Sequence, residues 1–102
     1  MSDELYTHGR WVVKEGQQEA FQSAWRELAE WTNASVDGAV GGEARLLEDL
    51  DDSRLFYSFG PWESLEAIEA WRASDGFQQR VVRLRELLDA FEPHTLRLNV
   101  QR

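Results

Sequence analysis

The chain has 102 residues, five of them Trp and none Cys, and its 19 acidic and 11 basic side chains give a formal net charge of -8. This length fits one domain, and a hydrophobic share of 42% indicates a globular protein and excludes a disordered one. The missing Cys excludes disulfides and thiolate metal sites, and the acidic balance disfavours nucleic acid as a partner. We expect a single domain over residues 1–102, with its core at about 5–101.

No targeting or membrane segment is evident in the chain. Residues 1–5 lack the basic and apolar regions of a signal peptide. No apolar run approaches the roughly 20 residues that a membrane span requires. Together with the missing Cys, these features predict a cytoplasmic protein that makes no contact with a membrane.

The first half of the chain predicts a strand over 5–14, a helix over 17–32, a loop over 33–42 and a hairpin of strands 44–50 and 54–60. The helix is indicated by Phe21, Ala24 and Leu28, which recur on one face at helical spacing. The first strand carries large residues on both faces, so we expect both of its faces to be covered.

The second half predicts two helices and a last strand. Gly60 and Pro61 end the preceding strand, and a helix starts near Trp62 with Ser64 as its N-cap. The buried stripe of this helix is predicted to be Leu65, Ile68 and Trp71, and the chain breaks at 74–76. The second helix is predicted from apolar residues at steps of four and three, which are Phe77, Val81, Leu84, Leu88 and Phe91. Pro93 stops it, and residues 94–101 alternate as a strand.

The resulting order is strand, helix, strand, strand, helix in two pieces, strand. This is the order of the ferredoxin-like fold, an α+β class with a four-stranded antiparallel sheet and helices on one face. The first and third predicted strands carry aromatic side chains on both faces, so the face without helices requires a cover. A second copy packed sheet against sheet is the simplest cover, which predicts a homodimer.

Residues 46–72 (LLEDLDDSRLFYSFGPWESLEAIEAWR), with Ser-Asp-Gly-Phe at 74–77, resemble the antibiotic biosynthesis monooxygenase family. That family shows an Asp-Asp turn, an aromatic-rich strand and a Trp-Glu-Ser helix start. The opening strand and the Phe/Trp helix are similar too, so the resemblance spans nearly the whole chain. It implies a dimeric α/β barrel of ferredoxin-like protomers. The family includes cofactor-free oxygenases of polycyclic quinols, haem-degrading enzymes and members of unknown role.

The resemblance to the haem-degrading branch fails at its ligand positions. Trp71 and residues 74–77 match that branch, but the place of its haem-ligating His holds Val81, and its functional Asn falls near Gly9. Neither side chain has a lone pair to give to iron. Haem binding and degradation are therefore disfavoured.

The cofactor-free branch places its pocket Trp at Trp62, and its Asn four residues earlier falls at Ser58. Such chemistry requires an apolar cavity, a group that accepts a proton and donors that stabilise an oxyanion. The leading hypothesis is a monooxygenase that acts on a hydrophobic aromatic substrate, of the quinol or polyketide kind, without a metal or other cofactor. The alternative is a non-enzymatic dimer that binds or senses a small molecule.

The candidate site is assigned from these two arguments. His8 is the titratable base of the first strand and suits general-base work, since an unperturbed His has a pKa near 6.5. We predict His8 and Trp62 as catalytic and, as substrate-binding residues, Ser58, Trp71, Phe77, Val81 and Arg83. Arg83 fits two interpretations, an oxyanion-holding residue at the pocket mouth or part of a solvated face that pairs with Glu86 and Asp89.

The remaining aromatic and His residues have simpler interpretations. Trp62 and Trp71 also fit a purely structural role, Trp11 and Trp25 suit the core or an interface, and Trp31 suits the rim or the dimer contact. Pairing of the first and last strands is expected to bring His8 nearer Leu98 than His94. A metal site made by the two His residues is therefore not expected.

Overall fold

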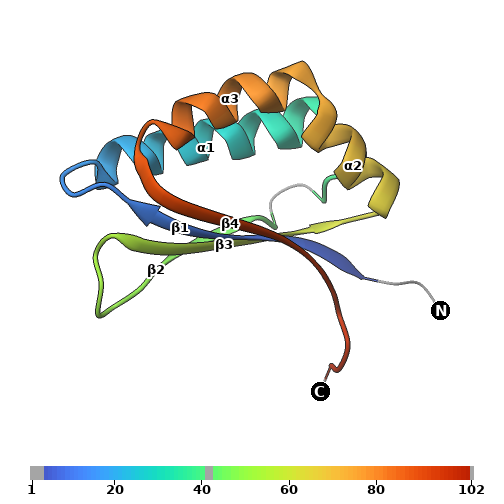
Figure 1. Cartoon of the computed structure of the whole chain (residues 1–102). Helices are drawn as coiled ribbons and strands as arrows, with labels where there is room; N and C mark the ends of the chain where they lie inside the picture. The colour runs from blue at the N-terminus through green and yellow to red at the C-terminus, as the bar shows by residue number, and fades with distance from the viewer. Residues whose placement is uncertain (1–3, 41–42, 102) are drawn as a thin grey trace.

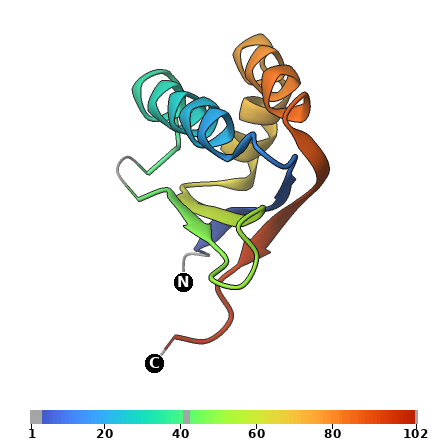
Figure 2. The same cartoon turned by 90° about the vertical axis from the view of Figure 1, so that its left-hand side faces the viewer.

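The computed structural model describes residues 4–40 and 43–101. Its elements follow in the order β1 (Leu5–Val13), α1 (Gln18–Ser35), β2 (Arg45–Glu48), β3 (Leu55–Trp62), α2 (Leu65–Ala73), α3 (Asp75–Arg85) and β4 (Leu88–Arg97) (Figure 1). The strands form one antiparallel sheet in the order β2-β3-β1-β4. All three helices lie on one face of this sheet (Figure 1, Figure 2). The predicted α+β ferredoxin-like fold is confirmed. None of the described helices is long and apolar enough to cross a membrane.

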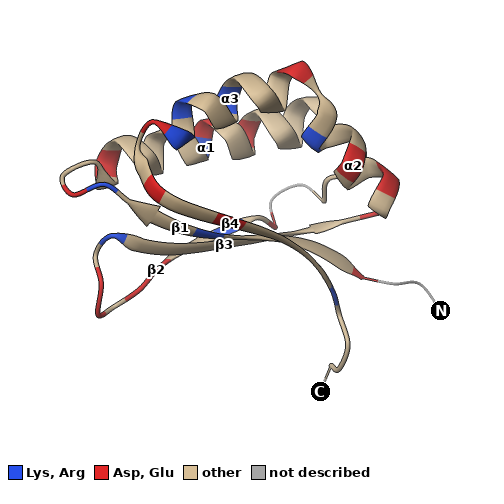
Figure 3. Ribbon diagram, in the orientation of Figure 1, with Lys and Arg blue, Asp and Glu red and all other residues tan. Residues whose placement is uncertain are grey.

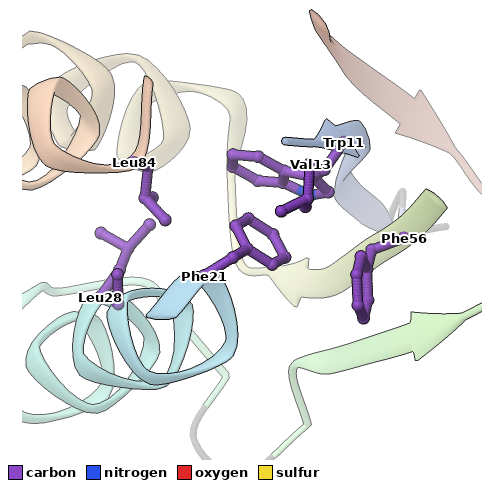
Figure 4. Packing of buried hydrophobic residues seen from close by; sticks show 7 residues of the cluster. Trp11, Val13, Phe21, Leu28, Phe56 and Leu84 are labelled. Carbon is purple, nitrogen blue, oxygen red and sulfur yellow. The ribbon is translucent and has the colours of Figure 1, made fainter. Parts of the chain in front are cut away.

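The core lies between the helices and the centre of the sheet. The side chain of Phe21 points from α1 into the space beside Trp11 and Phe56 (Figure 4). Its ring centroid lies 5.4 Å from that of Trp11 and 5.2 Å from that of Phe56. Leu28 and Leu84 close the cluster from α1 and α3. Each large apolar side chain buried here contributes about 1.5–3 kcal/mol, so this cluster is the main source of stability.

Two serines fix the helix that the sequence placed in two pieces. The side chain of Ser64 accepts a hydrogen bond from the N–H of Ala67 and begins α2, as predicted. Ser74 separates α2 from α3: its hydroxyl donates to the carbonyl of Trp71 at 2.7 Å and accepts from the N–H of Phe77 at 3.2 Å. The Ser64 cap and the break at 74–76 were therefore predicted correctly. Of the predicted stripe, Ile68 is fully buried, but Leu65 is exposed.

The described elements differ in length from several predictions. The helix α1 runs on to Ser35, so the start of the predicted 33–42 loop is helical, and residues 41–42 lie outside the described residues. The strand β3 does not end at Gly60 but continues through Pro61 to Trp62. Pro61 is tolerated near this strand end, where its carbonyl accepts from the N–H of Val40 at 3.2 Å. Trp62 is thus a strand residue and not part of a helix.

The boundary between the last helix and the last strand was wrong. The helix α3 ends at Arg85, and Leu88 and Phe91 belong to β4, which is an edge strand. Phe91 stacks on Trp11 with ring centroids 4.1 Å apart. An apolar residue that the spacing assigned to a helix is therefore partly buried by pairing of β4 with β1. Pro93 lies inside this strand, which an edge position permits because its outer side has no strand to bond.

The early start of β4 also changes the register against β1. His8 pairs with His94, and not with the level of Leu98 as predicted. The two imidazole centroids are 5.7 Å apart. Because the strand begins at Leu88 and not at residue 94, every pairing is shifted along β1 by several residues. The premise that separated the two histidines was therefore wrong.

Candidate functional site

A cavity of about 300 Å³ lies between the helices and the sheet. Four of the predicted substrate-binding residues line it together with Trp62, which was predicted as catalytic; the four are Ser58, Trp71, Phe77 and Val81. They come from β3, α2 and α3, so the fold brings together residues that are distant in the sequence. Trp25, which the sequence placed in the core or an interface, also lines this cavity.

Aromatic rings in mutual contact form one wall of the cavity. The ring centroid of Trp71 lies 4.9 Å from that of Trp62 and 4.4 Å from that of Phe77, with tilted planes in both pairs. Tilted contacts at these separations are favourable between aromatic rings. The wall therefore offers an apolar, aromatic surface against which a polycyclic ring system can pack.

Three of the indole N–H groups in this region donate to hydroxyl oxygens. The pairs are Trp11 Nε1 to Ser58 Oγ at 2.9 Å, Trp62 Nε1 to Thr7 Oγ1 at 3.1 Å and Trp71 Nε1 to Thr32 Oγ1 at 3.0 Å. The rings are thereby fixed in orientation, and their N–H groups are already used. The indole N–H of Trp62, which was predicted as catalytic, is therefore already engaged by Thr7.

The three hydroxyls that accept from the indoles differ in whether their own proton is free to be donated. Thr32 Oγ1 donates to the carbonyl of Leu28 at 2.7 Å, so its proton is also used. Ser58 and Thr7 accept from indoles, and neither donates its hydroxyl proton to another of the described residues. A hydroxyl has one proton to donate besides its lone pairs. Ser58 and Thr7 therefore keep a donor for a ligand in the cavity.

The floor of the cavity combines these hydroxyls with glycines. On the face that bears the helices, Ser58 pairs with Gly9 and Thr7 pairs with Gly60. A Cβ atom on Gly9 would lie 2.7 Å from Trp11 Nε1 and 3.0 Å from Ser58 Oγ, too close for either contact. The absence of a side chain at Gly9 is thus what lets the indole reach its hydroxyl across the floor.

His8 does not present its imidazole to this cavity. Side chains alternate along β1, and Thr7, Gly9 and Trp11 take the helix-bearing face, so His8 takes the opposite one. There its ring lies 6.0 Å from that of Tyr57 and 5.7 Å from that of His94, between centroids. His8 is nevertheless among the residues that line the cavity. Its imidazole lies on the face opposite that of Trp62, so the predicted role of His8 as a base beside Trp62 stays a prediction.

The basic residues are also arranged differently from expectation. Arg83 is exposed and lies 3.6 Å from Glu27 on α1, and Arg80 lies 3.5 Å from the same carboxylate. Arg83 is not among the described residues that line the cavity. The solvated-face interpretation agrees with its exposure, but its carboxylate partner is Glu27 and not Glu86 or Asp89. Arg72 and Arg85, which the sequence did not single out for the site, line the cavity instead.

Trp31 packs between α1 and the start of α3. A Cβ on Gly76 would collide with its indole, and the guanidinium of Arg80 lies 4.4 Å above its ring centre, a cation–π contact. Trp31 therefore fixes α3 against α1, a role that its position off the helical stripe did not suggest.

Several site residues were missed although the sequence carried a signal for two of them. Thr7 and Gly9 share the face of Trp11 by simple alternation, so the strand prediction already placed them beside it. Thr32, Arg72 and Arg85 come from three helices whose relative placement depends on tertiary packing. Among residues 4–40 and 43–101, no group of three His, Asp or Glu side chains is arranged to hold a metal ion. Val81, at the position of the family's haem ligand, is a buried apolar wall residue.

Solved structures with the same fold include proteins from bacteria and an archaeon. SnoaB, a cofactor-independent oxygenase from Streptomyces nogalater, is 22% identical with a TM-score of 0.85, covering 98% of this chain and 97% of SnoaB. A conserved protein from Methanosarcina mazei is 18% identical with a TM-score of 0.81, covering 92% of this chain and 91% of that one. A protein from Pseudomonas aeruginosa is 22% identical with a TM-score of 0.78, covering 98% of both chains. At these identities the likeness establishes a shared fold.

Sequence comparison is more specific about the family. No curated protein matches the chain. The family model for antibiotic biosynthesis monooxygenase matches residues 5–83, which include β1, the hairpin and the Trp62 region. This match covers well over half of the sequence and agrees with the fold and with the resemblance in residues 46–77. The chain therefore belongs to the antibiotic biosynthesis monooxygenase family.

Proposed function

We propose that this protein is a cofactor-independent monooxygenase that oxidises a hydrophobic aromatic substrate of the quinol or polyketide kind. The observation that carries the proposal is the pair of hydroxyls, Ser58 and Thr7, whose protons remain available in the floor of an aromatic-walled cavity. Donors aimed at the site where negative charge develops are the commonest device for stabilising an oxyanion. Family membership and the likeness to SnoaB support the same reaction class.

For an anthrone-type substrate, the reaction balances without a cofactor when the substrate supplies the electrons. Loss of a proton to water gives a ring anion whose oxygen is stabilised by the two hydroxyls. Dioxygen then forms a C–O bond at a ring methylene carbon, and the O–O bond breaks. One oxygen stays as a carbonyl, and the other leaves as water with both methylene hydrogens. The carbon loses four electrons and dioxygen gains four, so the substrate is the only reductant.

Oxygen uptake tests the proposal directly. With anthrone or a naphthoquinol, the chelator-treated protein is expected to consume oxygen well above the spontaneous rate; with anthrone, it should use one dioxygen per carbonyl formed. The cavity holds the substrate beside both donors, and that positioning accelerates the reaction. The measurement uses an oxygen electrode together with product analysis. Tight binding of these compounds with no turnover above background would contradict the proposal and favour a non-enzymatic binder.

We also propose that a second copy of the chain covers the sheet face that carries no helix. This face presents Phe59, Leu47 and Leu96, and Leu47 and Leu96 are 49% and 46% exposed. Apolar side chains gathered on one face favour association, and the family forms dimers of this kind.

A measurement of the molecular mass in solution tests the proposed dimer. Light scattering after size exclusion is expected to give twice the mass of 11.8 kDa. Leu47→Glu should shift the species to a monomer, because it places a charge in the apolar face. Leu50→Glu is the matched control, since Leu50 lies in the exposed turn after β2. A monomer for the unaltered chain at micromolar concentration would refute the dimer.

A further inference from the structure

The cavity wall carries positive charge and no negative charge, in a chain with an excess of acidic residues. The whole sequence has 19 acidic and 11 basic side chains. Figure 3 shows acidic residues on the outer turns of the helices and on the turn between β2 and β3. Yet among the described residues that line the cavity there are two arginines, Arg72 and Arg85, and neither Asp nor Glu. The described lining of the cavity is therefore positively charged, although acidic side chains outnumber basic ones in the whole chain.

Arg85 is available to a ligand. It is the last residue of α3 and exposed, and it lies on the same helix face as Gln78 and Val81, which also line the cavity. The neighbouring arginines of α3 both approach the carboxylate of Glu27. No carboxylate among the described residues lies within ion-pair distance of Arg85.

Arg72 is held in place by neutral groups alone. Its Nη1 donates to Thr95 Oγ1 at 2.7 Å, and its Nη2 donates to the carbonyl of His94 at 3.3 Å. Partial burial lowers the pKa of Arg72, because the desolvated guanidinium lacks a counter-charge. A half-buried cation with only neutral partners is stabilised when an anion enters the same space.

We propose that the ligand of this cavity is an aromatic carboxylate. Its ring system lies on the Trp62–Trp71 wall, and its carboxylate pairs with Arg85 and is also attracted by the positive charge of Arg72. This inference rests on the proposed function of the cavity as an aromatic-binding site and adds the charge of the ligand to it. The planar fork of a guanidinium matches a carboxylate with two hydrogen bonds, which a neutral amide of the same shape cannot reproduce. The exposed lining residues Gln78, Arg85 and Pro93 indicate that the cavity reaches solvent between α3 and β4, where the charged end of the ligand would lie.

Two ligands of one shape and different charge test this inference. In calorimetry at low ionic strength, the unaltered protein is expected to bind 2-naphthoate about tenfold more tightly than 2-naphthamide. Arg85→Gln should reduce this ratio to below about threefold and leave the affinity for the amide unchanged. Arg83→Gln is the matched control on the same helix, and it should keep the tenfold ratio because Arg83 faces Glu27 and lies outside the cavity.

The outcomes separate this inference from the proposed function. Equal affinity of the unaltered protein for the carboxylate and the amide would overturn the inference, and so would an equal loss of preference in Arg85→Gln and Arg83→Gln. Oxygen uptake with neutral quinols alongside equal affinities would leave the oxygenase proposal standing. A clear carboxylate preference without oxygen uptake by any substrate would support the inference and contradict the oxygenase proposal.

Discussion

Replacing Ser58 with alanine is expected to lower kcat about 100-fold, since removal of one oxyanion donor has this effect in comparable sites. Ser58 is buried, lines the cavity and keeps its hydroxyl proton for a ligand. The same substitution leaves the indole N–H of Trp11 without its acceptor. We therefore expect a fall of about 1–2 kcal/mol in the free energy of unfolding as well. Steady-state oxygen uptake and urea denaturation measure the two effects.

Two further serine variants make the result interpretable. Ser58→Thr retains a hydroxyl and is expected to recover most of the lost activity. Ser23→Ala, on the exposed surface of α1, should change neither activity nor stability. If folded Ser58→Ala oxidised substrate at the rate of the unaltered protein, Ser58 would have no part in stabilising the oxyanion.

Gly9→Ala is expected to impair both the fold and the site. The new Cβ would lie 2.7 Å from Trp11 Nε1, and the indole cannot retreat because it stacks on Phe91 at 4.1 Å. Overpacking of this kind costs about 1–3 kcal/mol. The displaced indole would also break its hydrogen bond to Ser58, so turnover should fall at least tenfold. Thermal denaturation and oxygen uptake check the two parts.

The other glycine of the floor supplies the comparison. A Cβ on Gly60 would lie 3.3 Å from the Cβ of Ala44, a contact that a shift of a few tenths of an ångström relieves. We expect Gly60→Ala to change the unfolding free energy by less than about 1 kcal/mol. Equal destabilisation by the two substitutions would show that the collision with Trp11 is not the cause.

The order of elements and the aromatic wall were predictable because they depend on local patterns. Alternation defined β1, helical spacing defined α1, and Ser64 and Ser74 marked the helix starts. The family motif placed Trp62 and Trp71 together, and the structure brings their rings into contact. These features need only short stretches of sequence to specify them.

The strand register and the charged residues of the cavity could not be predicted in the same way. Leu88 and Phe91 are three residues apart, which is helical spacing and not the alternation of a regular strand. The register shift between Val12 and Val13 lets both residues face the helices from β4, and a local pattern does not reveal that shift. The start of β4 set the partner of His8. The choice of Arg85 over Arg83 likewise depends on how α3 is rotated against α1, which Glu27 and Trp31 help to fix.

Ser74 fixes the bend between α2 and α3, the two helices that carry Trp71 and Phe77 of the cavity wall. Its one hydroxyl bonds to the residue before the bend, Trp71, and to the residue after it, Phe77. The bend between α2 and α3, which carries these two residues, is therefore fixed by the Ser74 hydroxyl, while the Trp71 ring is oriented by its hydrogen bond to Thr32. Ser74 takes no part in the strand pairing, so we expect a substitution there to change the aromatic wall while the pairing of the sheet stays intact.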